Sequence, residues 1–135
     1  MTAFPKKTLR VGFVGTGFIA KFHLKAMVGV RNVEVTGVYS RNADNRQRIA
    51  DHVSELGLGE CRTHETLQSL LQADDVDAIW ILTPNHTRLD IMRTIHDEVK
   101  NGRSGVFAVA CEKPLGRTIA EAREMLRLAE DASLN

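Results

Sequence analysis

Cysteine, proline and aromatic residues are scarce in this chain, and it has neither a strong net charge nor a long apolar run. Its two cysteines, Cys61 and Cys111, are too few for a disulfide framework and suit a reducing compartment as free thiols. The 18 Lys and Arg residues nearly balance the 17 Asp and Glu residues, so no broad basic field exists to bind nucleic acid or an anionic membrane. No apolar run approaches the ~20 residues of a membrane span, and the N-terminal sequence MTAFPKKTLR lacks the apolar stretch of a signal peptide. We therefore expect a soluble, cytoplasmic protein that binds neither nucleic acid nor membrane.

The most informative segment is an apolar run that leads into the glycines of GTGFIA, from Gly15 to Ala20. Val11, Phe13 and Val14 have the pattern of a buried strand, and apolar residues recur at helical spacing after the glycines. In such a strand–turn–helix unit the first glycine permits the tight turn, the second lets the backbone approach a pyrophosphate, and a small third residue lets helix and strand pack closely. The phosphates would lie at the N-terminal end of the helix, where unpaired N–H groups and the helix dipole favour negative charge. The segment predicts a dinucleotide site, and the alternative is a glycine-rich turn without a ligand.

Strands and helices alternate along the rest of the chain at the spacing of a doubly wound sheet. The sequence predicts further strands over 33–39, 60–64, 76–82 and 106–110, and further helices over 43–56, 66–72, 86–99 and 118–132. Parallel pairing through right-handed crossovers then gives an α/β Rossmann fold with about five strands and flanking helices. At this length the whole chain, 1–135, suits one domain.

Three polar segments follow the carboxyl ends of predicted strands: 15–20, 83–86 and 112–113. Ligands of doubly wound sheets bind beyond the carboxyl ends of the strands, where the strand order reverses. We therefore expect the three segments to converge on one crevice.

The end of the second strand determines the choice of cofactor. A NAD site usually has Asp or Glu about twenty residues past the glycines, where the carboxylate accepts hydrogen bonds from the ribose hydroxyls. Ser40 and Arg41 occupy those positions here. A guanidinium cannot accept a hydrogen bond but pairs well with phosphate, so the sequence favours NADP, with NAD possible. Arg46 and Arg48 lie nearby and are more simply explained as part of a solvated helix face.

The other two polar segments have both a structural and a functional interpretation. Pro84 cannot continue a strand ladder, and Thr83 and Asn85 beside it can reach a ligand, although a plain turn with Asn85 as helix N-cap explains the same residues. Lys113 is either an exposed loop lysine or an ammonium directed at a substrate. Partial desolvation would lower its pKa towards the range useful for acid–base work.

The motifs GTGFIA, ILTPNH and CEKPLGRT, in this order and spacing, resemble the nucleotide-binding domain of the Gfo/Idh/MocA family of NAD(P)-dependent oxidoreductases. The resemblance covers nearly the whole chain. It implies that Lys113 is catalytic and hydrogen-bonds the reacting oxygen of a sugar-like or polyol substrate during hydride transfer. The cofactor-binding residues that it implies are Gly15, Gly17, Phe18, Ile19 and Ala20 at the pyrophosphate, Ser40 and Arg41 at the adenosine ribose, and Thr83, Pro84, Asn85 and Glu112 at the nicotinamide riboside, with His86 beside them.

Two features depart from the family pattern. Many members have a second histidine two positions after the one in TPNH, where this chain has Arg88. Members also continue into a sixth strand and a substrate domain, which supplies Asp and His partners for the catalytic lysine. The chain thus corresponds to a cofactor domain without its substrate half, and we expect it to be inactive by itself. The alternative function is a stand-alone NAD(P)-binding sensor or regulatory module without turnover.

Other candidate sites have simpler explanations. His52, Cys61 and His64 match no standard zinc module, so we expect no metal site. His23 lies in the first helix near the crevice, but such a residue is more often a partly buried helix residue than a catalyst. Core packing is the default interpretation of Trp80.

The fifth strand gives a last expectation. Without a sixth strand it forms the outer edge of the sheet, and its apolar sequence has no charge or proline to discourage pairing with another strand. We expect this edge to be covered by the chain's own terminal residues or by a neighbouring molecule, and the domain to self-associate as a homo-oligomer.

Overall fold

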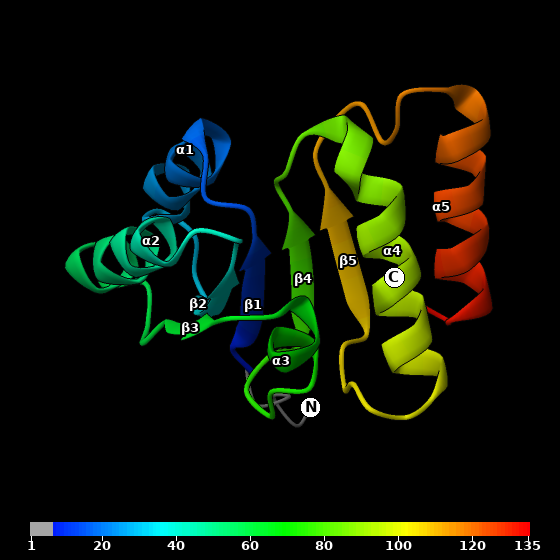
Figure 1. Cartoon of the computed structure of the whole chain (residues 1–135). Coiled ribbons are helices and arrows are strands. Elements are labelled where there is room, and N and C mark those ends of the chain that lie inside the picture. Colours follow the sequence, from blue (N-terminus) through cyan, green and yellow to red (C-terminus); the bar gives the residue numbers. More distant parts are fainter. Residues whose placement is uncertain (1–6) are drawn as a thin grey trace, which may run out of the picture.

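A computed structural model describes residues 7–135, which form a parallel five-stranded sheet with helices on both faces (Figure 1). The strand order is β3-β2-β1-β4-β5, which confirms the predicted Rossmann class. No helix within the described residues is long and apolar enough to cross a membrane. The strands are β1 (Leu9–Val14), β2 (Val33–Tyr39), β3 (Arg62–His64), β4 (Ala78–Ile81) and β5 (Ala108–Cys111). The helices are α1 (Phe18–Met27), α2 (Ala43–Glu55), α3 (Leu67–Leu71), α4 (Asn85–Lys100) and α5 (Ile119–Asp131).

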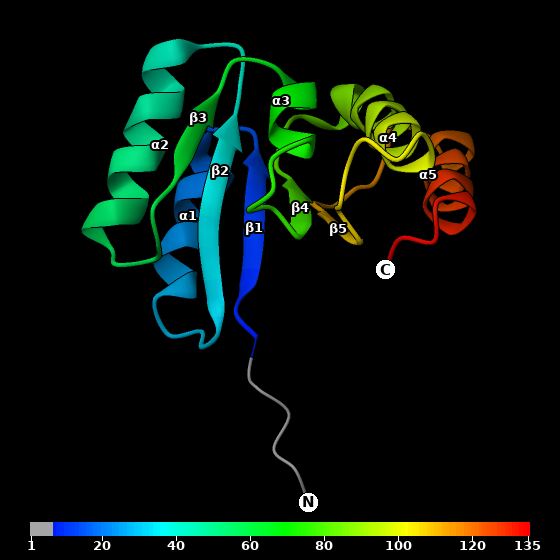
Figure 2. The same ribbon diagram turned by 90° about the horizontal axis from the view of Figure 1, so that it is seen from below.

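Two apolar cores lie on opposite faces of the sheet. On one face α1 and α2 pack against β1 and β2, around the fully buried Phe13. On the other face α3 and α4 pack against β1 and β4, around Val14 and Ile79. The alternation of Phe13 and Val14 shows why the run in β1 is apolar throughout, because both faces of this central strand are covered. Helix α5 packs outside α4, as Figure 2 shows from below.

The carboxyl ends of the three central strands meet at one edge of the sheet. The Gly15 N–H donates to the Tyr39 carbonyl (2.9 Å), and the Leu82 N–H donates to the Val14 carbonyl (2.8 Å). One strand further along, the Glu112 N–H donates to the Ile81 carbonyl (3.0 Å). These bonds bring the beginnings of the three polar segments to the same edge, as the strand order requires.

Three strand predictions were wrong at their ends. The third and fourth strands are shorter than 60–64 and 76–82, and the fifth runs over Ala108–Cys111 instead of 106–110. Val106 is buried in the core under α4 and not in the strand ladder, so its apolar character reflects packing. Apolar runs report burial, and burial alone does not separate a strand from the segment that leads into it.

The chain's terminal residue covers part of the outer edge of β5, which confirms one of the two expected arrangements. The Val109 N–H donates to the Asn135 carbonyl (2.9 Å), and the Asn135 N–H donates to the Phe107 carbonyl (3.0 Å). Self-association of the domain stays a prediction.

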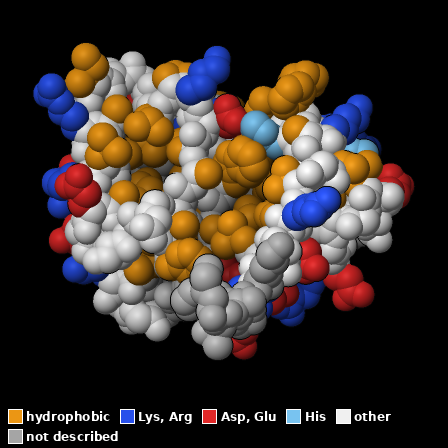
Figure 3. All heavy atoms as spheres, turned by 180° about the vertical axis from the view of Figure 1, so that it is seen from behind, with side chains coloured by type: hydrophobic (Ala, Val, Ile, Leu, Met, Phe, Trp, Pro, Cys, Tyr) orange, Lys and Arg blue, Asp and Glu red, His pale blue; other side chains and the backbone are white. Residues whose placement is uncertain are grey.

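The face of β4 and β5 on the side of α1 carries an apolar hollow of about 470 Å³. Figure 3 shows hydrophobic side chains gathered on this face. Its wall includes Trp80 of β4 and His23 of α1.

Candidate functional site

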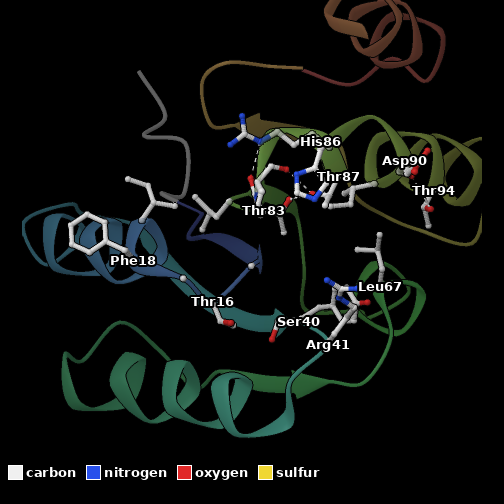
Figure 4. Close-up of a pocket in the computed structure, with 18 of the residues that line it drawn as sticks. Thr16, Phe18, Ser40, Arg41, Leu67, Thr83, His86, Thr87, Asp90 and Thr94 are labelled. Carbon is white, nitrogen blue, oxygen red and sulfur yellow. Dashed lines mark hydrogen bonds between the residues drawn. The ribbon is translucent and has the colours of Figure 1, made fainter. Parts of the chain in front are cut away.

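A pocket of about 1060 Å³ lies at the carboxyl ends of β1, β2 and β4. This volume suits a large small-molecule ligand. In Figure 4, Thr83, His86 and Thr87 lie across the pocket from Ser40 and Arg41. The lining residues come from the glycine segment, the end of β2, the start of α3, and the end of β4 with α4: Gly15, Thr16, Gly17, Phe18, Ile19, Tyr39, Ser40, Arg41, Leu67, Gln68, Leu82, Thr83, Pro84, His86, Thr87, Arg88, Asp90, Ile91 and Thr94.

The two glycines of the first turn are needed for different reasons. Gly15 has φ +116°, and a Cβ there would lie 3.0 Å from the Leu82 carbonyl carbon, so both the backbone conformation and the close approach of β4 require glycine. A Cβ on Gly17 would meet no protein atom within 4 Å. Gly17 therefore leaves open space in the pocket wall at the start of α1, where the predicted pyrophosphate would approach the backbone.

Three helices begin at the pocket, α1, α3 and α4, and two of them lack a side-chain N-cap. Side chains cap α2, α3 and α5, through Asn42, Thr66 and Thr118. In α1 and α4 the N-cap residues are Gly17 and Pro84, and neither helix has a side-chain cap. The first turns of these two helices also contain no acidic residue. Their free N–H groups and positive dipole ends fit anionic or polar ligand groups at the pocket.

The cap of α4 tests one part of the structural interpretation of the TPN segment. Pro84, and not Asn85, is the N-cap residue, and Asn85 is the first residue of the helix. The Thr87 hydroxyl donates to the Pro84 carbonyl (2.7 Å) and lies within hydrogen-bonding distance of the Thr83 hydroxyl (2.8 Å), which fixes the turn internally. The interpretation of Asn85 as a helix cap is therefore wrong.

The end of β2 presents a cation to the pocket. Arg41 is exposed at the pocket wall, and its side chain makes no hydrogen bond or ion pair with any residue in 7–135. The neighbouring Arg46 is different, because it is buried and its Nη1 donates to the Ser40 carbonyl (2.7 Å). The sequence had led us to expect Arg46 on a solvated helix face. It is instead buried and fixes the backbone that carries Arg41. Ser40 Oγ donates only a long bond, to the Asn42 carbonyl (3.3 Å).

A comparison with protein families matches residues 9–134 to the oxidoreductase family with an NAD-binding Rossmann fold, GFO_IDH_MocA. The chain belongs to this family. It is 32% identical to the rhizopine catabolism protein MocA of Rhizobium meliloti over 90% of this chain and 34% of that protein. It is 30% identical to inositol 2-dehydrogenase of Rhizobium meliloti (strain 1021) over 92% of this chain and 33% of that protein. A crystal structure of the 3-ketoreductase KijD10 from Actinomadura kijaniata, in complex with NADP and TDP-benzene, superposes with a TM-score of 0.77 at 26% identity, over 95% of this chain and 35% of that one. The chain thus spans about a third of the length of these relatives.

Arg88, two positions after His86, connects the TPN and EKP segments. It is 6% exposed, and its guanidinium donates to the carbonyls of Thr83 (2.9 Å), Glu112 (2.7 Å) and Pro114. A buried cation needs such partners, and these three carbonyls come from segments far apart in the sequence. Sequence reasoning noted Arg88 only as a departure and missed this role.

Four residues assigned by the family resemblance do not line the pocket. Ala20 is fully buried between α1 and the sheet, where its small size permits close packing. Asn85 is half-buried in the first turn of α4. Lys113 is exposed beyond β5. The carboxylate of Glu112 hydrogen-bonds to Nε2 of His23 in α1, so its bonding partner in this structure is a protein side chain.

Several lining residues had not been predicted, among them Leu67 and Gln68 at the start of α3. They follow the carboxyl end of β3, so the rule that located the other segments also applied to them. Cys111 ends β5, and burial raises the pKa of its thiol, which keeps it protonated and unreactive as a nucleophile.

Proposed function

We propose that this chain is the cofactor-binding part of an oxidoreductase that prefers NADP(H) and transfers hydride to or from a carbohydrate or polyol-like substrate. The pocket supports this proposal most directly, because a glycine turn, two helix N-termini without side-chain caps and an arginine with no partner among residues 7–135 face one space. When bound, the nicotinamide would supply or accept the hydride. The protein supplies binding and orientation.

Each part of the pocket has a distinct role in this proposal. The open space at Gly17 lets the pyrophosphate reach the N–H groups of the first turn of α1, as Phe18 and Ile19 face the same pocket. Ser40 and Arg41 would hold a 2′-phosphate. The end of β2 carries no carboxylate that would repel this phosphate.

The other end of the cofactor would lie against the start of α4. Thr83, Pro84 and His86 line that part of the pocket and would contact the nicotinamide riboside. Arg88 holds Thr83 and the segment before Lys113 at a fixed distance, because it donates to carbonyls of both. Lys113 would then hydrogen-bond the reacting oxygen of the substrate and move its proton.

The substrate class rests on the relatives, which include an inositol 2-dehydrogenase, together with an exposed lysine at the expected place. Because Lys113 faces solvent in this chain, the residues that exclude water and orient a substrate must come from elsewhere. We propose that a substrate domain supplies them and that residues 1–135 alone bind cofactor without turnover. We also propose that the protein is a cytoplasmic homo-oligomer, in keeping with its free cysteines and its apolar sheet edge.

Cofactor titration and an activity assay test the proposal together. Added NADPH should bind saturably to the chain, as followed by its fluorescence, and no steady oxidation of NADPH should follow when a keto-sugar is added. The absence of binding by either NADPH or NADH would reject the proposal. Turnover abolished by Lys113→Ala would show that this chain suffices for catalysis.

The alternative, a sensor without turnover, also requires cofactor binding but gives Lys113 no task. A longer protein that binds NADPH and remains inactive on every keto-sugar and polyol tested would favour it.

A further inference from the structure

His23 lies at a junction of three elements, in the wall of the apolar hollow on the α1 side of the sheet. Its Nε2 hydrogen-bonds to the carboxylate of Glu112, directly before Lys113. Its ring lies over Trp80 of β4, with ring centroids 4.2 Å apart and planes inclined by 36°. Trp80 in turn meets Phe13 of β1 edge to face, with centroids 5.8 Å apart. A continuous series of contacts therefore leads from the buried centre of the sheet to the segment that carries the lysine.

The surroundings of the pair favour a fixed geometry. The side chains of His23 and Glu112 are 19% and 16% exposed, so water competes little for their hydrogen-bonding groups. The Glu112 backbone is held at both ends, since its N–H donates to Ile81 and its carbonyl accepts from Arg88. With the backbone and the carboxylate both held, little freedom remains at the residue preceding Lys113.

Neither His23 nor Glu112 lines the dinucleotide pocket. The arrangement therefore gives neither residue a direct role in binding the cofactor. His23 lies on α1, the helix whose N-terminal end forms the pyrophosphate side of the pocket. The hydrogen bond to Glu112 thus connects the cofactor-binding helix with the lysine segment across the end of β4.

We propose that His23 is a positioning residue for Lys113: it holds the Glu112 carboxylate against α1 and Trp80, and so fixes the lysine relative to the bound dinucleotide. This inference rests on the proposed cofactor site. It assigns Glu112 a partner within the protein in place of direct contact with the nicotinamide riboside.

The test follows Lys113 directly in the full chain. Reductive methylation with ¹³C-formaldehyde labels the lysine amines and keeps their charge, and Lys113→Arg identifies the Lys113 signal in the NMR spectrum. In the unsubstituted chain, NADPH should shift this signal. In His23→Leu the shift should be lost, while the dissociation constant of NADPH stays within about threefold, because the pocket lining is unchanged.

Three further variants separate positioning from general damage. His23→Gln keeps a donor near the position of Nε2 and should restore the shift. Glu112→Ala should lose it, and the double variant His23→Leu/Glu112→Ala should lose no more than either single variant, because the two residues act as one unit. The matched control is His96→Leu, which removes a histidine–carboxylate bond to Asp131 (2.7 Å) far along α4 and should leave the shift intact.

The outcomes are distinguishable from failure of the proposed function. A normal Lys113 shift in His23→Leu with NADPH bound would overturn the inference and leave the cofactor site standing. So would Glu112→Ala weakening NADPH binding where His23→Leu does not, since Glu112 would then act on the cofactor directly. If His23→Leu does not fold, Glu112→Ala decides by the same shift. A chain that binds neither NADPH nor NADH overturns both proposals.

Discussion

Replacing Arg41 by alanine should selectively weaken the binding of NADPH. Arg41 lines the pocket at the end of β2, where a NAD site usually has a carboxylate that accepts hydrogen bonds from the ribose hydroxyls. Its side chain has no partner within residues 7–135, so it is free to pair with a phosphate. Its backbone is fixed nearby through Arg46, which bonds to the carbonyl of Ser40.

The expected size of the effect follows from the position of Arg41 at the pocket wall. A hydrogen bond to a charged group contributes about 1.5–3 kcal/mol, and exposure to solvent places Arg41 at the lower end of that range. Since about 1.4 kcal/mol corresponds to tenfold in a dissociation constant, NADPH should bind about tenfold more weakly to Arg41→Ala. NADH lacks the 2′-phosphate and should bind almost as before. Added salt should reduce the preference in the unsubstituted chain, because it screens exposed charges.

Fluorescence titration of both cofactors, with calorimetry as a second measurement, would provide the four dissociation constants. Arg48→Ala is the matched control, because it removes the same charge from an exposed position on α2 outside the pocket lining. Equal affinities for NADPH and NADH in the unsubstituted chain would refute the reasoning. An equal loss for both cofactors in Arg41→Ala would also refute it, by showing that Arg41 contacts a part that the two cofactors share.

Three further predictions concern stability and the glycine turn. Gly15→Ala should lower the free energy of unfolding by about 2 kcal/mol in urea titrations, because Gly15 has a positive φ and a close backbone contact. Gly17 has φ −79°, so Gly17→Ala should unfold normally but bind NADPH poorly. Arg88→Leu leaves three carbonyls without their donor and should cost about 3 kcal/mol in the same titration, and an unchanged midpoint would contradict this role. The Arg10 guanidinium holds the pKa of Asp77 below its usual range. The stabilisation of the fold by this ion pair is therefore complete above about pH 4 and is lost as the pH falls through the lowered pKa. In Asp77→Asn the free energy of unfolding should therefore fall less steeply as the pH is lowered. A fall as steep as in the unsubstituted chain would contradict a stabilising role of the Arg10–Asp77 pair.

The strand order and the position of the crevice could be predicted because they depend on local patterns and on topology. Apolar runs located the strands, and right-handed parallel connections allow few arrangements of them. The glycine turn was readable for a similar reason, since the tight approach of β1 to β4 at Gly15 tolerates no Cβ. The limits of β5 were not readable, because Val106 is apolar for packing and not for pairing.

The contacts that connect the segments were missed, although the helices carried a signal for them. In α1 the buried residues Ala20, Leu24 and Met27 define an inward stripe, and His23 lies three residues after Ala20 and four before Met27. A helix places residues at these spacings on one face, so a polar side chain there must find a partner within the fold.

The same argument applies to Arg88. It lies four residues before Met92 and seven before Ile95, on the buried stripe of α4. The spacing alone predicts a buried cation that requires acceptors, but which carbonyls accept depends on how the end of β4 and the segment after β5 meet in space. Periodicity therefore identifies the residues that must be satisfied internally, and only the three-dimensional structure identifies their partners. His23 and Arg88 both have partners at Glu112, directly before Lys113, which is why the lysine segment, exposed as it is, has a defined position.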